Sequence, residues 1–167
     1  MEFKPMAMRG WIVDDDPIFQ LTAEQVFRQV SGWDKVESFL RAREALDELQ
    51  YRHRSEPSTL PDAILLDLNM PVVNGWQFIE EWERESAMSQ KDIRIIVVSA
   101  SLGFSERDRI KGKRSVLSAL DKPIQAQELR DLLSFAIHPA QYSGHGAPPI
   151  WHSGNRKDFS DCYYNAY

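Results

Sequence analysis

The sequence has little of what would point to the cell exterior, a membrane or nucleic acid. It holds a single cysteine, Cys162, so no disulfide can form within the chain, which suits a reducing compartment. No apolar run approaches the length of a membrane span, and residues 1–9 lack the apolar central stretch of a signal peptide. The net charge of −5 gives no reason to expect non-specific binding to nucleic acid. We therefore expect a cytoplasmic protein that contacts neither a membrane nor nucleic acid directly.

Hydrophobic residues, by contrast, make up 43% of the 167 residues, enough for one packed domain with a margin for a tail. They form short apolar runs that predict strands at residues 10–13, 33–39, 63–66, 93–98 and 116–120. Between and after them, apolar residues recur at helical spacing at 17–30, 42–49, 75–82 and 126–136. Residues 104–114 indicate a weak helix, and residues 52–61 read as a loop. Strands that alternate with helices predict an α/β fold, a doubly wound parallel sheet of five strands with helices on both faces.

Polar residues close four of these strands. Asp14 and Asp15 follow the first, Asp67 the third, Ser99 the fourth and Lys122 the fifth. Ligands of doubly wound sheets bind beyond the carboxyl ends of the strands, so the fold would bring these side chains together. None of them is informative alone, because each could be an ordinary turn or surface residue. The set is informative.

The chemistry of this set favours phosphoryl transfer. Three carboxylates in one crevice repel each other, and a hard divalent cation such as Mg²⁺ relieves that repulsion through oxygen ligands. Lys122 supplies a fixed positive charge for a phosphoryl group, and Ser99 supplies a hydroxyl donor. An aspartate can act as the nucleophile and form an acyl phosphate.

The order of these residues resembles the receiver domain of two-component response regulators. The resemblance rests on the acidic pair at 14–15, the stretch 65–71 (Leu-Leu-Asp-Leu-Asn-Met-Pro) followed by Gly75, then Ser99-Ala100 and Lys122-Pro123. It covers residues 8–138, with an N-terminal extension at 1–7 and an aromatic-rich tail at 139–167. The family implies a flavodoxin-like sheet with strand order 2-1-3-4-5.

The resemblance also implies a magnesium site and its ligands. Asp15 and Asp67 would bind Mg²⁺ directly, together with the main-chain carbonyl of Asn69, and Asp14 would act through a bound water. Asp16 lies just past the acidic pair, and we expect it to cap the following helix instead.

The same resemblance assigns the phosphoryl chemistry. Asp67 would be the phosphoacceptor, Ser99 would bind a phosphoryl oxygen and move on activation, and Lys122 would pair with the phosphoryl group, with a cis bond to Pro123. One departure matters. Many receivers carry Tyr or Phe three residues before the lysine, where this chain has Ala119, so signalling through a ring on the fifth strand is in doubt.

These features predict a signalling protein, not an enzyme. Asp67 would accept its phosphoryl group from a sensor histidine kinase or a histidine phosphotransfer protein, in a Mg²⁺-dependent reaction that the domain itself assists. A phosphorylation-dependent change of surface would then reach an unknown downstream protein. Residues 139–167 are too few for a DNA-binding output domain, so we expect a receiver without a fused effector.

Three other functions are compatible with parts of this sequence. An aspartyl-phosphate phosphatase would use an Asp-x-Asp pair, which residues 14–16 offer, but the usual Thr or Val after it and a cap domain are missing. A flavin-binding module needs a Ser/Thr/Gly-rich phosphate loop where this chain has aspartates. A pseudo-receiver that only binds partners usually lacks an acidic or lysine position, and none is lost here.

Two segments stay open. Five cations in residues 106–114 form either a solvated helix face or a partner-docking surface, and a Ser105–Asp108 pair resembles the start of that helix. The tail at 139–167 is either loose or docks through its aromatic residues. Its histidines and Cys162 show no tight ligand spacing, so we expect no metal site there.

Overall fold

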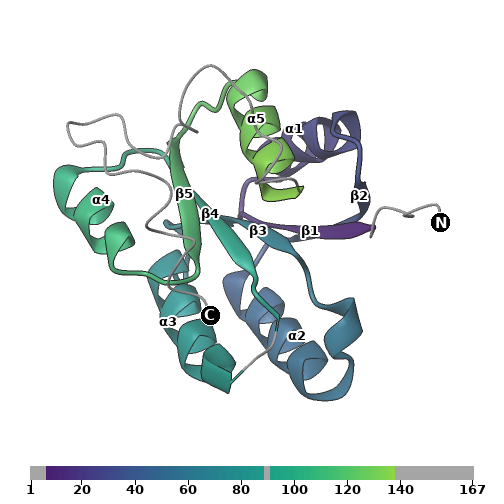
Figure 1. The fold of residues 1–167 in the computed structure, drawn as a ribbon. Helices are drawn as coiled ribbons and strands as arrows, with labels where there is room; N and C mark the ends of the chain where they lie inside the picture. Colours follow the sequence, from purple (N-terminus) through teal and green to yellow (C-terminus); the bar gives the residue numbers. More distant parts are fainter. Residues whose placement is uncertain (1–6, 89–90, 138–167) are drawn as a thin grey trace.

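The computed structural model describes residues 7–88 and 91–137, and within them it shows one parallel sheet between two layers of helices (Figure 1). The strand order β2-β1-β3-β4-β5 confirms the predicted topology. The strands are β1 (Met8–Val13), β2 (Trp33–Phe39), β3 (Ala63–Asp67), β4 (Arg94–Ser99) and β5 (Val116–Asp121). All four neighbouring pairs are parallel, so the carboxyl ends of the strands meet at one edge of the sheet.

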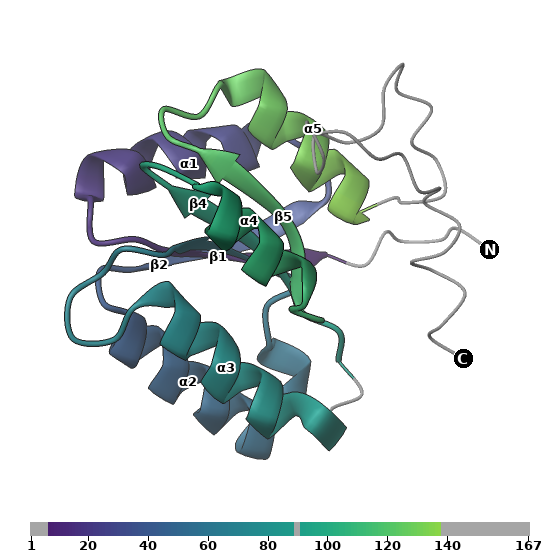
Figure 2. The ribbon, with the colours of Figure 1, turned by 90° about the vertical axis from the view of Figure 1, so that its left-hand side faces the viewer.

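The helices lie on both faces of the sheet. They are α1 (Pro17–Gln29), α2 (Ala42–Ser55), α3 (Gly75–Glu85), α4 (Phe104–Lys111) and α5 (Ala126–Ile137), with short 3-10 turns at Pro57–Thr59 and Ser86–Met88. Figure 2 shows α1 and α5 on one face, α2 and α3 on the other, and α4 beside β5. None of the helices in the described part of the chain is long and apolar enough to cross a membrane.

The sheet separates two hydrophobic clusters, because neighbouring residues of a strand point to opposite faces. On β1, Trp11 joins the cluster under α2 and α3, whereas Ile12 joins the cluster under α1 and α5. The central strand β3 is buried along its whole length, which explains why its sequence is an unbroken apolar run before Asp67. The core thus fixes the strand that ends in this carboxylate.

Three local expectations were wrong. Residues 52–55 belong to α2 and not to a loop, since Arg52 is held by side chains on β2 and on α2 itself. Helix α4 ends at Lys111, because Gly112 follows as its C-terminal cap. The Ser105–Asp108 pair does not start α4: the Glu106 carboxylate accepts a hydrogen bond of 2.8 Å from the Gly103 amide instead.

One partly buried charge network joins β1, β2 and α2. The Arg52 guanidinium donates two hydrogen bonds to Glu37, of 2.8 and 2.9 Å, and a third of 2.7 Å to Glu48. The Trp11 indole donates to the same Glu37 carboxylate at 3.2 Å. Because Arg52 hydrogen-bonds the charged form, the pKa of Glu37 falls from 4.5 to about 2.

This network predicts a pH-dependent stability. Since the pKa of Glu37 is lower in the folded protein, its contribution is present above about pH 4.5 and is lost as the pH falls towards about 2. Glu37→Gln should therefore lower the free energy of unfolding at pH 7 by about 3 kcal/mol, and hardly at all near pH 2. Urea unfolding across this pH range measures both. Glu44→Gln, which removes an exposed ion pair with Arg41, is the matched control and should change little.

Candidate functional site

The polar strand-end residues meet at the carboxyl edge of the sheet. One carboxylate oxygen each from Asp14, Asp15 and Asp67 lies within 4.8 Å of the others. The Lys122 ammonium reaches into this group, with its Nζ 2.6 Å from Asp14 Oδ2 and 3.9 Å from Asp67 Oδ2. Asp14, Asp67 and Ser99 are buried, whereas Asp15 is exposed. The structure thus brings together residues that stand more than a hundred positions apart.

The turn from β1 to α1 is held by a residue that the sequence analysis did not single out. Gln20 is buried, and its side-chain amide donates to the main-chain carbonyls of Asp14, at 2.9 Å, and of Phe39, at 2.8 Å. The Asp14 amide donates to the same Phe39 carbonyl at 3.1 Å. The Gln20 side chain therefore bridges the ends of β1 and β2, at the point where the acidic run begins.

Asp14 and Asp16 of that run accept hydrogen bonds from different main-chain amides. The Asp14 Oδ1 atom accepts a hydrogen bond of 2.9 Å from the Asp16 amide. Asp16 caps α1, since its carboxylate accepts from the Ile18 amide at 2.9 Å, which confirms the capping expectation. The Asp16 carboxylate thus faces the helix, whereas those of Asp14 and Asp15 form an acidic cluster with Asp67.

Asn69 links Asp67, at the end of β3, to the Ser99 hydroxyl at the end of β4. The Asp67 carboxylate accepts a hydrogen bond of 3.3 Å from the Asn69 amide, and the Asn69 side chain donates to Ser99 Oγ at 3.0 Å. Helix α3 begins directly against this strand end. A Cβ on Gly75 would lie 2.5 Å from the Asp67 carbonyl oxygen, so glycine is needed there for a close backbone approach.

Electrostatics at this edge disfavour the charged carboxylates. Burial raises the pKa of Asp67 above its usual value, and the negative charge of Asp14 raises it further, while Lys122 lowers it. Burial also raises the pKa of Asp14, against the opposing hydrogen bond from Lys122. Three carboxylates therefore share one ammonium. Their hard oxygen atoms are the ligand type that Mg²⁺ prefers, so the donor set fits the predicted metal.

The end of β5 ties the site to α4. The Lys122 amide donates to the Ser99 carbonyl at 2.7 Å, and the Lys122–Pro123 bond is cis, as expected. The neighbouring Asp121 carboxylate accepts a hydrogen bond of 3.0 Å from the Leu102 amide and pairs with the guanidinium of Arg107 on α4. Arg107 also donates to the Leu102 carbonyl at 3.2 Å. We call these three residues, Leu102, Arg107 and Asp121, the α4 latch.

The other cations of residues 106–114 also have partners. Arg109 Nη2 lies 2.6 Å from Glu80 Oε1 on α3, with its guanidinium 4.2 Å from the centre of the Trp76 ring, and Lys113 reaches the same Glu80 at 3.3 Å. Only Ile110 of α4 is buried. The cations therefore join α4 to α3 and β5 instead of forming a purely solvated face.

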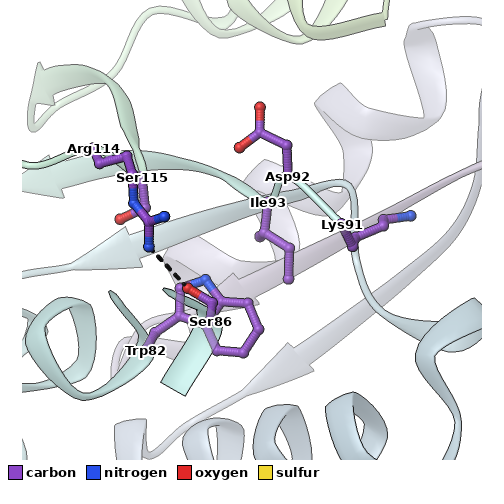
Figure 3. Close-up of a pocket in the computed structure, with 7 residues that line it drawn as sticks. All are labelled: Trp82, Ser86, Lys91, Asp92, Ile93, Arg114 and Ser115. Carbon is purple, nitrogen blue, oxygen red and sulfur yellow. Dashed lines mark hydrogen bonds between the residues drawn. The ribbon is translucent and has the colours of Figure 1, made fainter. Parts of the chain in front are cut away.

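A small hollow lies at the opposite edge of the sheet, beside the starts of β4 and β5 (Figure 3). It measures about 130 Å³ and is lined by Trp82 and Ser86 at the end of α3 and by residues that directly precede β4 and β5. The Arg114 guanidinium at its rim already donates to Ser86 Oγ at 3.3 Å and to the Glu83 carbonyl at 3.2 Å. Arg114 thus joins the end of α3 to the segment that precedes β5. The tail at 139–167, with Cys162, lies outside the described residues.

Comparison with known proteins places these features in one family. The family model described as "Response regulator receiver domain" matches residues 11–134. Response regulator Rre1 of Synechocystis is 29% identical over 73% of this chain and 48% of its own length. Two-component response regulator ORR26 of rice is 30% identical over 77% of this chain and 20% of its own length. The chain thus spans about half or less of these two relatives.

Solved structures agree with the family model. A response regulator receiver protein from Dyadobacter fermentans is 30% identical, with a TM-score of 0.63 over 78% of this chain and 98% of its own. A two-component response regulator from Cytophaga hutchinsonii has a TM-score of 0.70 over 80% of this chain and 98% of its own, at 20% identity. The second likeness concerns the fold alone.

Proposed function

Because this chain belongs to the response regulator receiver domain family, we propose that its Asp67 carboxylate accepts a phosphoryl group from the phosphohistidine of a sensor kinase or of a histidine phosphotransfer protein. One observation carries the proposal: Lys122 Nζ lies 2.6 Å from Asp14 and 3.9 Å from Asp67, inside a cluster of three carboxylates. A nucleophile, a cation site and a fixed positive charge are the parts that this transfer requires.

In the proposed step an oxygen of Asp67 attacks phosphorus while the bond from phosphorus to the donor nitrogen breaks. The imidazole leaves with the electron pair of that bond, and the product is an acyl phosphate on Asp67. Asp15, Asp67 and the Asn69 carbonyl would hold Mg²⁺, with Asp14 acting through water. The bound ion would offset the charge of the carboxylates and of the incoming phosphoryl oxygens.

Lys122 and Ser99 would bind the transferred group. The Lys122 ammonium is close enough to Asp67 to pair with a phosphoryl oxygen after a small shift from Asp14. The Ser99 hydroxyl accepts from Asn69, and its own proton faces only a long contact of 3.5 Å to the Ser101 carbonyl. That proton can be redirected to a phosphoryl oxygen at little cost, because the bond it leaves is at the limit of hydrogen-bond distance.

We propose that the domain acts as a cytoplasmic phosphoacceptor that assists its own phosphorylation and dephosphorylation, and not as an enzyme acting on other substrates. The phosphatase alternative would need Asp16 as its second carboxylate. Asp16 is instead engaged as the cap of α1, which counts against that alternative. The complete set of acidic and lysine residues likewise counts against a pseudo-receiver.

The proposal is tested with the wild-type chain, Mg²⁺ and acetyl phosphate, followed by intact-mass spectrometry. We expect one phosphoryl group per chain, stable in acid and released by hydroxylamine, because an acyl phosphate reacts with that nucleophile. Chelating the Mg²⁺ with EDTA should prevent uptake. If the mass does not change with Mg²⁺ present, the chain is not a phosphoacceptor.

A second expectation concerns the output route, because Ala119 provides no ring on β5 to move. Ser99, the loop after β4 and the α4 latch form the connected alternative. A beryllofluoride mimic on Asp67 should therefore change amide hydrogen exchange mainly in residues 100–114, and less near Ala119. Ser99→Ala should still accept phosphoryl but show a smaller change in this segment. Equal exchange there in free and mimic-bound protein would exclude this route.

A further inference from the structure

The Lys122 ammonium lies against an aromatic ring as well as against two carboxylates. Besides the carboxylates of Asp14 and Asp67, its Nζ lies over the Phe19 ring, whose centre is 4.5 Å away. The side chain of Lys122 is 21% exposed, so water reaches only part of it. An ammonium within about 6 Å of the centre of an aromatic ring is attracted to the negative face of the ring.

Phe19 is well fixed for such a contact. It lies in the first turn of α1, between the Asp16 cap and the buried Gln20. Part of its side chain packs against the hydrophobic cluster under α1 and α5. Neither end of this turn can move freely, because Asp16 bonds Ile18 and Gln20 bonds two main-chain carbonyls. The Phe19 ring is therefore held in place beside the long, flexible side chain of Lys122.

An aromatic ring differs from a carboxylate because it attracts the ammonium and leaves its positive charge available for another anion. An ion pair with Asp14 cancels the lysine charge and holds Nζ on the Asp14 side, 2.6 Å from that carboxylate against 3.9 Å from Asp67. The ring attracts the ammonium without cancelling its charge. A cation bound near Asp14 would weaken the ion pair between Asp14 and Lys122. The contact with the ring would remain and would keep the ammonium where it can pair with a phosphoryl group on Asp67.

We propose that Phe19 is a positioning residue for Lys122: its ring face keeps the ammonium between Asp14 and Asp67, ready for the phosphoryl group. The inference rests on the proposed function, since it concerns the same transfer to Asp67. It adds a residue of α1 to a site whose other members lie at strand ends or in the loops that follow them. At sequence level Phe19 looks like an ordinary member of an apolar helix face.

The test is a series of four variants in the full chain. Phe19→Leu keeps apolar bulk but removes the ring, Phe19→Tyr and Phe19→Trp keep a ring, and Ile18→Ala removes an exposed apolar side chain from the same turn. One readout is the initial rate of phosphoryl uptake from acetyl phosphate with Mg²⁺. The other is the NMR shift of the Lys122 ε-methylene protons in the unphosphorylated protein, which a ring face moves upfield. Thermal unfolding of each variant reports on packing.

We expect Phe19→Leu to slow uptake by about two- to thirty-fold, the range of a cation–π contact between exposed and desolvated sites. It should also return the Lys122 protons to the shift of an ordinary lysine. Phe19→Tyr should restore both readouts, with Phe19→Trp as a second restoring variant. Ile18→Ala should match the wild type in rate and in Lys122 shift.

The outcomes separate this inference from the proposed function. If the wild-type chain takes up no phosphoryl group, the proposed function fails, while the Lys122 shifts still report whether the ring contact exists. If the wild type reacts and Phe19→Leu reacts equally fast, the positioning role is overturned. If Leu and Tyr slow uptake equally, the ring acts through packing alone, and the inference is overturned as well.

Discussion

Asp67→Asn should leave the chain folded but unable to take up a phosphoryl group from acetyl phosphate and Mg²⁺. The amide has nearly the shape of the carboxylate but is not a nucleophile, so uptake should fall to background. Stability should not suffer. Because burial and Asp14 raise the pKa of Asp67, its charged form costs free energy in the folded state at neutral pH. We therefore expect a melting temperature equal to or above that of the wild type.

The matched control for this variant is Asp16→Asn, in the same acidic edge of the sheet. Asp16 caps α1, and asparagine caps helices about as well as aspartate. This variant should keep both its stability and full phosphoryl uptake. Uptake by Asp67→Asn at the wild-type stoichiometry would mean that another residue is the acceptor.

Gly75→Ala should destabilise the fold by about 2–3 kcal/mol, a large effect for one methyl group. The new Cβ would lie 2.5 Å from the Asp67 carbonyl oxygen and 2.8 Å from the Leu68 Cα. Both atoms belong to the backbone of the buried strand end, so neither can swing aside as a flexible side chain would. Helix α3 has to shift away from β3, and the hydrogen bond of 3.0 Å from the Gly75 amide to the Leu68 carbonyl should weaken.

Urea unfolding measures this loss, and Gly112→Ala is its control. A Cβ on Gly112 would meet its nearest atom at 3.7 Å, and the φ of −85° is open to alanine. That substitution should be neutral or slightly stabilising, because alanine reduces the freedom of the unfolded chain. A Gly75→Ala protein as stable as Gly112→Ala would show that α3 does not need its close approach to β3.

The sequence was sufficient for the fold, because hydrophobic periodicity follows directly from which face of an element is buried. The unbroken apolar run before Asp67 predicted a strand buried on both faces, and β3 is such a strand. The end of α2 was misplaced for a related reason. Its last turn is stabilised by Arg52 reaching Glu37 on β2, and a contact across 15 residues leaves no periodic trace in the sequence.

The strand-end residues were found because topology alone brings them together. Phe19 and Gln20 were not found, since their roles depend on how the first turn of α1 faces Lys122 and the end of β2. Val72 was missed as well. It has a φ of 68° between Pro71 and Val73, whose amide donates to the Pro71 carbonyl at 2.9 Å. A β-branched residue is rarely found in that region, and no local propensity predicts it there.

Asp121 of the α4 latch is followed directly by Lys122 of the site, so two opposite charges stand on consecutive residues. Asp121 is held by Arg107 of α4, and Lys122 by Asp14 of the site. If a phosphoryl group on Asp67 draws Lys122 from Asp14, and a partner binds α4 by displacing Arg107 from Asp121, the two events act on adjacent residues. If partner binding at α4 raises the affinity of the site for the phosphoryl group, phosphorylation must raise the affinity for the partner by the same factor. A downstream partner would then act as an effector of the phosphoryl site, and its concentration would set how strongly the site holds the group.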